Sequence, residues 1–231
     1  MILGLGGPLL VGSGENPLKV SSFIAGLTQG ATVTEYRDRQ RGIELRLTPP
    51  GAYRLLGLPM SELTGRVVDL EALWGRRATE LLERLAEAAD WSGRFAVLDR
   101  ELSRRANEGP IPDPELERAW LRLEQTSGNL RISDLAEDSG WSRRRLAERF
   151  RIQTGLTPKA LARVLRFEHA VKLLTGFGHR SLASIADACG YYDQAHLNRD
   201  FRELAGCTPT EYLQAWRSDG LGTAFSGDGQ P

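Results

Sequence analysis

Residues 135–141 (LAEDSGW) and residues 185–191 (IADACGY) repeat one pattern at an offset of 50 positions. One residue is then added in the second copy, and the match resumes at an offset of 51 up to the Thr-Pro pairs at residues 157–158 and 208–209. Two copies of a unit of about 25 residues are too few for a solenoid, which needs about three or more repeats. The pattern therefore predicts a pair of equivalent supersecondary units in the C-terminal half.

Each copy has the sequence pattern of a helix-turn-helix. First helices are predicted at 133–139 and 181–189, each with an alanine in its middle that lets another helix cross closely. A glycine then ends the helix where a left-handed backbone is favoured, and a Ser or Asp caps the next helix. These residues are Gly140, Gly190, Ser142 and Asp193. Second helices are predicted at about 143–153 and 194–204, with apolar residues at i and i+4 toward the core.

The opposite face of such a second helix enters the major groove of DNA. Arg can bond guanine O6 and N7, Asn or Gln can pair with adenine, and Glu can accept from cytosine N4, whereas Ala offers only an apolar contact. The candidate base-reading residues are Arg143, Arg144, Ala147, Glu148, Gln194, Ala195, Asn198 and Arg199. The candidate phosphate contacts are Ser142, Arg145, Arg151, His196 and Arg202. The alternative is two plain helical hairpins with polar outer faces, which a capped and repeated pattern disfavours.

The charge distribution points to the same partner. The chain has a formal net charge of zero, but residues 142–166 contain eight Lys and Arg against one acidic residue, Glu148. A local excess of this kind is what phosphate backbones select. A solvated basic face is the alternative that charge alone leaves open.

Composition divides the chain into two predicted domains. Residues 109–114 hold three prolines and predict a linker, because such a segment cannot form a helix or a central strand. Residues 115–217 have a helical pattern throughout, and the Gly-rich residues 218–231 predict a disordered tail. A helix from Pro158 to about Leu174 would be a rod of about 25 Å, enough to set two reading helices about one DNA turn apart.

Residues 1–108 predict a small α+β domain. Short runs of period two predict about three antiparallel strands within 18–48. Amphipathic patterns then predict helices at 52–56, 77–89 and 92–106. The expected fold is therefore an all-α C-terminal domain preceded by this smaller α+β domain.

Residues 190–201 (GYYDQAHLNRDF), followed by 206–212 (GCTPTEY), resemble the signature of the AraC/XylS family of bacterial transcription regulators. The resemblance covers about residues 115–216 and implies seven helices, two helix-turn-helix units and a linker helix. It also implies an asymmetric promoter site and contact with RNA polymerase. The family's groove-facing positions fall on Arg144, Ala147, Glu148, Gln194, Ala195 and Arg199. Glu148 departs from the pattern, since a basic or amide residue is commoner there.

Residues 42–59 are similar to a sensor-like domain found in some of these regulators. Such domains usually begin with more strands than the pattern shows before residue 18, so a shortened N-terminal domain is one alternative. We expect a cytoplasmic transcription regulator that binds double-stranded promoter DNA. A small-molecule effector and a second copy of the chain are candidate partners through which residues 1–108 would modulate it.

Residues 1–114 contain no Cys and no His. This DNA-binding unit also occurs fused to alkyl-transfer enzymes, which need a reactive cysteine, so the composition disfavours that rival function. A His-based metal site is excluded from the same residues. The chain has no phosphate-binding loop and no hydrolase or zinc-protease motif. We expect no catalytic residue, no metal and no cofactor, and no membrane partner, because no run of about 18 apolar residues exists.

Overall fold

The computed structural model describes residues 1–12, 17–35, 40–176, 178 and 180–218. These residues divide into two compact units. The first contains residues 1–28, 32–120 and 136–158, and the second contains residues 29–31, 121–135 and those from 159 onward. The division into 1–108, a linker and 115–217 stays a prediction, and the predicted tail lies outside the described residues apart from Ser218.

Seven short strands form two antiparallel sheets in the described part of the first unit. They are β1 (Ile2–Gly4), β2 (Leu9–Val11), β3 (Leu18–Val20), β4 (Phe23–Ala25), β5 (Thr34–Glu35), β6 (Gly42–Glu44) and β7 (Val67–Asp69). One sheet has the order β6-β1-β4-β7 and the other β3-β2-β5. The prediction of about three strands was therefore wrong: residues 18–48 contain four, and three more lie outside that stretch.

The first of the period-two runs within 18–48, residues 19–24, predicts one strand but contributes to two strands of different sheets. The chain bends at Ser21 and Ser22, which separates β3 from β4. The Ser22 hydroxyl oxygen accepts a hydrogen bond from the Gly4 amide at 3.0 Å, so the bend is held against β1. A period-two pattern continues through such a bend and cannot reveal it.

The four-stranded sheet is a middle layer, and the alternation of side chains along its strands shows this. Leu3, Ile24 and Ile43 belong to a core shared with the helices of the unit. Ile2 and Phe23, one position away in β1 and β4, belong to a second core that includes strands of the other sheet. Successive side chains of a strand point to opposite faces, so both faces of this sheet are covered.

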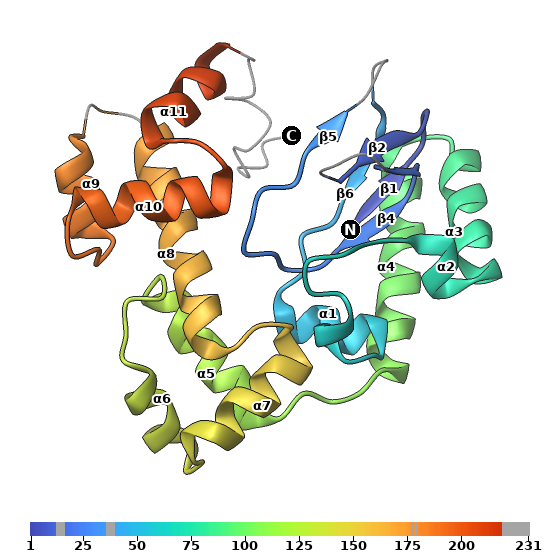
Figure 1. Cartoon of the computed structure of the whole chain (residues 1–231). Helices are drawn as coiled ribbons and strands as arrows, with labels where there is room; N and C mark the ends of the chain where they lie inside the picture. The colour runs from blue at the N-terminus through green and yellow to red at the C-terminus, as the bar shows by residue number, and fades with distance from the viewer. Residues whose placement is uncertain (13–16, 36–39, 177, 179, 219–231) are drawn as a thin grey trace. The chain divides into compact units, whose positions relative to one another are not determined.

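Residues 49–108 of this unit form four α-helices and one 3-10 helix, with β7 between the 3-10 helix and the second α-helix. They are α1 (Pro49–Leu56), η1 (Met60–Glu62), α2 (Leu70–Trp74), α3 (Arg76–Glu87) and α4 (Trp91–Glu108). Helix α1 begins three residues before its predicted start at residue 52, because Pro is well suited to the first helical position and Thr48 caps it. Helix α3 buries Ala78, Leu81 and Leu85, and Figure 1 shows it beside α4.

Seven helices occupy the described residues from 114 to 218, as the resemblance implied. They are α5 (Pro114–Gln125), α6 (Ile132–Ser139), α7 (Arg143–Thr154), α8 (Pro158–Thr175), α9 (Leu182–Ala188), α10 (Gln194–Ala205) and α11 (Pro209–Ser218). Figure 1 shows α9, α10 and α11 gathered around the C-terminal part of α8. In that core the rings of Phe167 and Phe201 meet edge to face, with centroids 4.8 Å apart. No helix within the described residues is both long enough and apolar enough to cross a membrane.

Candidate nucleic-acid interface

The two turns of the repeat are built by the same hydrogen bonds. In the first, the amides of Gly140 and Trp141 donate to the carbonyl oxygens of Glu137 and Ala136 at 3.1 and 3.2 Å. In the second, the amides of Gly190 and Tyr191 donate to Asp187 and Ala186 at 3.0 and 2.9 Å. This is the Schellman pattern, which needs a left-handed residue, and the two glycines have φ of +65° and +71°.

The second helix of each unit is capped as predicted. The Ser142 hydroxyl oxygen accepts from the Arg145 amide at 3.2 Å, and the Asp193 carboxylate accepts from the His196 amide at 2.7 Å. Helices α7 and α10 then end at left-handed glycines, Gly155 and Gly206. Both turns and both caps of the predicted helix-turn-helix units are thus confirmed.

One face of each second helix is completely buried. Leu146 and Phe150 of α7, and Leu197 and Phe201 of α10, are all 0% exposed. Helix α7 also buries Gln153 and Thr154, and α10 also buries Asp200 and Leu204. Since the buried residues of each helix lie on one side, the opposite face points away from the core.

The structure leaves most of the candidate base-reading residues on the surface. The exposed ones are Arg143, Arg144, Glu148, Gln194, Ala195 and Arg199. Ala147 and Asn198 are half-buried, and the side-chain oxygen of Asn198 is buried without a hydrogen-bond partner. Asn198 is therefore the least accessible polar member of the predicted set.

The candidate phosphate contacts surround these faces. Ser142, Arg145, Arg151 and Arg202 are exposed. The guanidinium of Arg145 lies over the Trp141 ring, 4.8 Å from its centroid, a contact that the sequence did not reveal. His196 is half-buried, and its ring meets that of Tyr191 edge to face at 5.1 Å.

The first turn of α7 contains three consecutive arginines, 143–145, and no acidic residue. Cations at a helix N-terminus oppose the helix dipole, so this arrangement is unfavourable for the helix by itself. The same residues concentrate positive charge where the helix dipole is also positive, which favours an anion such as a phosphate. The electrostatics of α7 therefore suit a nucleic-acid backbone.

Three contacts that sequence reasoning missed hold the C-terminal part of α7 within the first unit. The Arg149 guanidinium pairs with the Asp113 carboxylate at 2.7 Å, and the Asp113 amide donates to the Gln153 side chain at 3.0 Å. The Thr64 hydroxyl donates to the Gly155 carbonyl oxygen at 2.7 Å. Asp113 comes from the predicted linker and Thr64 from the predicted sensor-like domain.

In the second compact unit of the fold, an ion pair holds α10 against α8. Arg163 donates to one oxygen of Asp200 at 2.8 and 2.9 Å and also pairs with Glu203. Asp200 is 4% exposed, and its hydrogen bonds raise the pKa of the Arg163 guanidinium. Burial, together with the charge of Asp200, raises the pKa of the Tyr191 hydroxyl. Since α8 and α10 come together only in the fold, this pairing could not be predicted from the sequence pattern.

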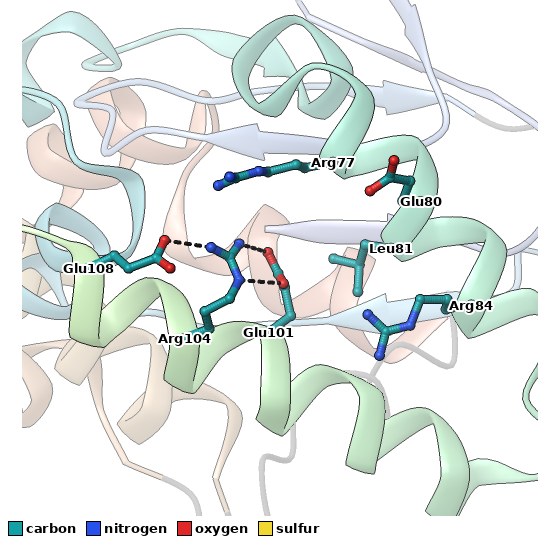
Figure 2. Close-up of a pocket in the computed structure, with 7 residues that line it drawn as sticks. All are labelled: Arg77, Glu80, Leu81, Arg84, Glu101, Arg104 and Glu108. Carbon is teal, nitrogen blue, oxygen red and sulfur yellow. Dashed lines mark hydrogen bonds and ion pairs between the residues drawn. The ribbon is translucent and has the colours of Figure 1, made fainter.

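A pocket of about 330 Å³ lies between α3 and α4 of the first unit (Figure 2). Its lining residues are Arg77, Glu80, Leu81, Arg84, Glu101, Arg104 and Glu108. Arg104 bridges Glu101 at 2.6 Å and Glu108 at 2.5 Å. Three arginines and three glutamates give this pocket a polar lining whose formal charges cancel.

The two cysteines have the environment of structural residues. Cys189 is buried in the core of the second helix-turn-helix, and burial raises the pKa of its thiol. Burial, followed by the charge of Glu211, also raises the pKa of the half-buried Cys207. Across the described residues, no group of three or more His, Cys, Asp and Glu could hold a metal ion.

Two equivalent helix-turn-helix units with exposed polar second helices define a double helix-turn-helix DNA-binding domain. Comparison with known proteins agrees: residues 135–215 match the family described as "Helix-turn-helix domain". The C-terminal half of the chain therefore contains an AraC-type helix-turn-helix DNA-binding domain.

Among the similar proteins is the HTH-type transcriptional activator RhaR of Yersinia pseudotuberculosis, which is 33% identical over 120 residues. The match includes 51% of this chain and spans 41% of the length of RhaR. The DNA-binding domain of AdpA, solved with a target DNA, is 30% identical and covers 46% of this chain and 96% of that one, with a TM-score of 0.42.

The structure of ToxT from Vibrio cholerae covers 92% of this chain and 88% of its own, with a TM-score of 0.51 and 15% identity. At that identity the likeness concerns the fold alone. It extends over both the strand-containing N-terminal part and the helical C-terminal part of the chain.

Proposed function

We propose that the chain is a sequence-specific transcription regulator that reads two adjacent major-groove segments of promoter DNA with α7 and α10. The observation that carries this proposal is the doubled helix-turn-helix, with the same turn and the same capping scheme in both copies. Each copy buries one apolar pair and leaves a polar face free, which is what groove entry requires. The match to RhaR, a transcriptional activator, supports the same role.

Base recognition differs between the two helices. In α10, Gln194 suits adenine and Arg199 suits guanine, while Ala195 can contact a thymine methyl group. In α7, Arg144 would read guanine and Glu148 would accept from cytosine. Arg143, Ala147 and Asn198 complete the proposed base-reading set. Helix α10, with an amide and an arginine, therefore carries the more definite preference.

Phosphate contacts would fix the register of both helices on the duplex. Arg145, Arg151 and Arg202 are exposed cations for this purpose, with Ser142 and His196 as further polar side chains. Helix α8 has 18 residues and so a length of about 27 Å, and such a rod could set two reading helices about one DNA turn apart. A single chain could therefore occupy two successive major-groove segments without a two-fold axis.

Residues 1–108 would modulate DNA binding through α7. The hydrogen bond from Thr64 to Gly155 ties the segment after η1 to the end of this reading helix. A small-molecule effector, for which the pocket between α3 and α4 is a candidate site, or self-association could act through that contact. The regulator would work in the cytoplasm and contact RNA polymerase, as the family resemblance implies.

Selection of bound sites from random double-stranded DNA, using the full chain, tests the proposal. We expect an asymmetric site with two specified segments about 10 base pairs apart. Arg144→Ala should relax the preference in one segment only, and Gln194→Ala in the other. Recovery of no enriched sequence would contradict sequence-specific reading, and loss of preference in the same segment from both variants would contradict the assignment of two reading helices.

The proposed self-association needs a separate measurement. Sedimentation of the full chain over a range of concentrations, with and without the selected DNA, would reveal a dimer if one forms. A chain that stays monomeric in every condition would leave an effector as the only route for modulation by residues 1–108.

A further inference from the structure

Tyr192 is the residue by which the second turn is longer than the first. In the first helix-turn-helix unit the Schellman turn ends at Trp141, and the helix cap, Ser142, is the next residue. In the second unit the equivalent turn ends at Tyr191, and Tyr192 stands before the cap, Asp193. The change of offset from 50 to 51 in the repeat is therefore this one residue.

The added side chain is fully presented to the surroundings. Tyr192 is 93% exposed, the highest value of any large hydrophobic side chain in the described part of the chain, whereas the neighbouring Tyr191 is 5% exposed. A single exposed aromatic residue is unremarkable by itself. Its position is informative here, because Tyr192 directly precedes the cap of a proposed reading helix and lies two residues before Gln194.

The backbone that carries this side chain is held in place. The Asp193 carboxylate accepts from the His196 amide at 2.7 Å, and the Tyr192 amide lies 3.5 Å from His196 Nδ1 as a weak donor. The His196 ring is packed edge to face on Tyr191. Tyr192 thus projects from a fixed backbone, so little conformational entropy is lost when its two side-chain torsions are ordered.

We propose that Tyr192 contacts the DNA backbone beside the segment read by α10, donating its hydroxyl to a phosphate oxygen and packing its ring on the adjoining sugar. This inference rests on the proposed function. The residues just before a recognition helix lie at the edge of the groove, where phosphates are the nearest groups. A tyrosine hydroxyl can donate a hydrogen bond to a phosphate oxygen.

The difference in charge between the two units makes a neutral donor useful at this position. Helix α7 begins with three arginines, whereas the first turn of α10 has no Arg or Lys and its cap, Asp193, is acidic. A carboxylate near the groove edge repels phosphate, so the second unit needs another contact at the start of its reading helix. Tyr192 supplies one without adding charge.

A neutral phosphate contact has a signature that distinguishes it from a cationic one. Binding by Lys or Arg releases counterions, so each such contact steepens the fall of affinity with salt. Removing a tyrosine hydroxyl should weaken binding without changing that slope. It should also weaken binding to specific and random DNA to the same extent, because the backbone carries no sequence information directly.

The test measures the DNA affinity of the full chain by fluorescence anisotropy, at several salt concentrations, on the selected site and on random DNA. Tyr192→Phe should weaken binding about two- to tenfold on both DNAs with an unchanged salt slope, the range expected for one hydrogen bond. Tyr192→Ala should weaken it further, since the ring contact is lost too. Arg202→Ala should lower the slope by about one, as a cationic contact would.

Phe95→Ala provides the matched control, because Phe95 is a half-exposed aromatic residue of α4. Its DNA affinity should equal that of the unmodified chain. Unchanged DNA affinity in both Tyr192 variants would overturn the inference, and so would a loss confined to transcription with RNA polymerase, which would assign Tyr192 to a protein partner. Failure of the unmodified chain to select any site would instead contradict the proposed function.

Discussion

The hydroxyl of Thr64 donates a hydrogen bond to the carbonyl oxygen of Gly155 over 2.7 Å, joining two residues that are 91 positions apart in the chain. Gly155 ends α7 with a left-handed backbone, φ +89°. A Cβ atom at this position would lie 2.9 Å from the Thr64 hydroxyl oxygen and 3.1 Å from the carbonyl oxygen of Met60. The segment at residues 60–64 therefore fits closely against the residue that ends the first reading helix.

Gly155→Ala should destabilise the chain more than Gly140→Ala. Both glycines are left-handed, so each substitution costs about 1–2 kcal/mol for the backbone conformation alone. A Cβ at Gly140 would meet nothing within 4 Å, whereas at Gly155 the backbone of Met60 must also shift. Urea denaturation of the two variants measures the difference. Equal losses of unfolding free energy would show that the segment is not closely packed on Gly155.

Thr64→Val should change DNA binding as well as stability. It keeps the shape of the side chain but removes the donor to Gly155, which we expect to cost about 0.5–1.5 kcal/mol of unfolding free energy. If residues 1–108 modulate α7 through this contact, the affinity of the full chain for its selected site changes too. Thr79→Val is the control, because the Thr79 hydroxyl bonds to Glu71 on an exposed surface. If both variants bind the selected site with the same affinity, the contact made by Thr64 does not regulate DNA binding.

The helix-turn-helix units could be predicted because their signals are local. Each unit has three signals within about 15 residues: a left-handed glycine, a helix cap two or three residues later, and an apolar pair at i and i+4. The same signals occur in both copies of the repeat. The side chains that face away from the core follow from the same periodicity. Asn198 shows the limit of this reasoning. Its position in the helix predicted an accessible side chain, but Asn198 follows the buried Leu197 and is half-buried.

Contacts between segments distant in sequence could not be predicted in this way. Strands β1, β2 and β7 have three residues each, too few to establish a period of two. The bond between Thr64 and Gly155 joins two ordinary residues whose proximity only the fold creates. The added residue of the second turn could be located from the sequence, because the offset of the repeat changes there. Only the structure shows that this residue, Tyr192, is exposed.

Asp200→Asn should destabilise the second unit more than Glu203→Gln. The side chain of Asp200 is 6% exposed and accepts two hydrogen bonds from Arg163, so its loss leaves a mostly buried cation short of a partner. Because Arg163 is 24% exposed and keeps Glu203, we expect a cost of about 1–3 kcal/mol. Glu203 is 53% exposed, and its removal should cost less than about 1 kcal/mol. Chemical denaturation of both variants decides the order, and the reverse order would contradict this account.

Arg199→Ala should weaken binding to the selected site by about 1–3 kcal/mol and relax the preference at one base pair. Binding to random DNA should change much less, because a base contact contributes little there. Arg76→Ala is the control, since the side chain of Arg76 is 90% exposed on α3 and pairs only with Glu80 on the same helix among the contacts described. Titration of specific and random DNA with both variants checks the prediction. An equal loss on both DNAs would assign Arg199 to the phosphate backbone.

The stability of the first unit should fall in acid because of Glu101. Burial by itself would raise the pKa of this carboxyl, but hydrogen bonds from Arg104 and Arg105 outweigh it and hold the pKa below the ordinary value of 4.5. The unfolded chain therefore binds this proton at higher pH than the folded chain does. The stabilisation is present above about pH 4.5 and is lost as the pH falls through the lower, folded value.

Glu101→Gln should remove that part of the acid sensitivity, because an amide does not titrate. Unfolding free energies measured between about pH 6 and pH 3 should converge, with the unmodified chain more stable at the upper end and losing its advantage toward the lower end. Glu80→Gln is the matched control, since Glu80 is 53% exposed and pairs only with the exposed Arg76 among the ion pairs described. A constant difference between the unmodified chain and Glu101→Gln across this range would show that the carboxylate of Glu101 does not stabilise the fold through its charge.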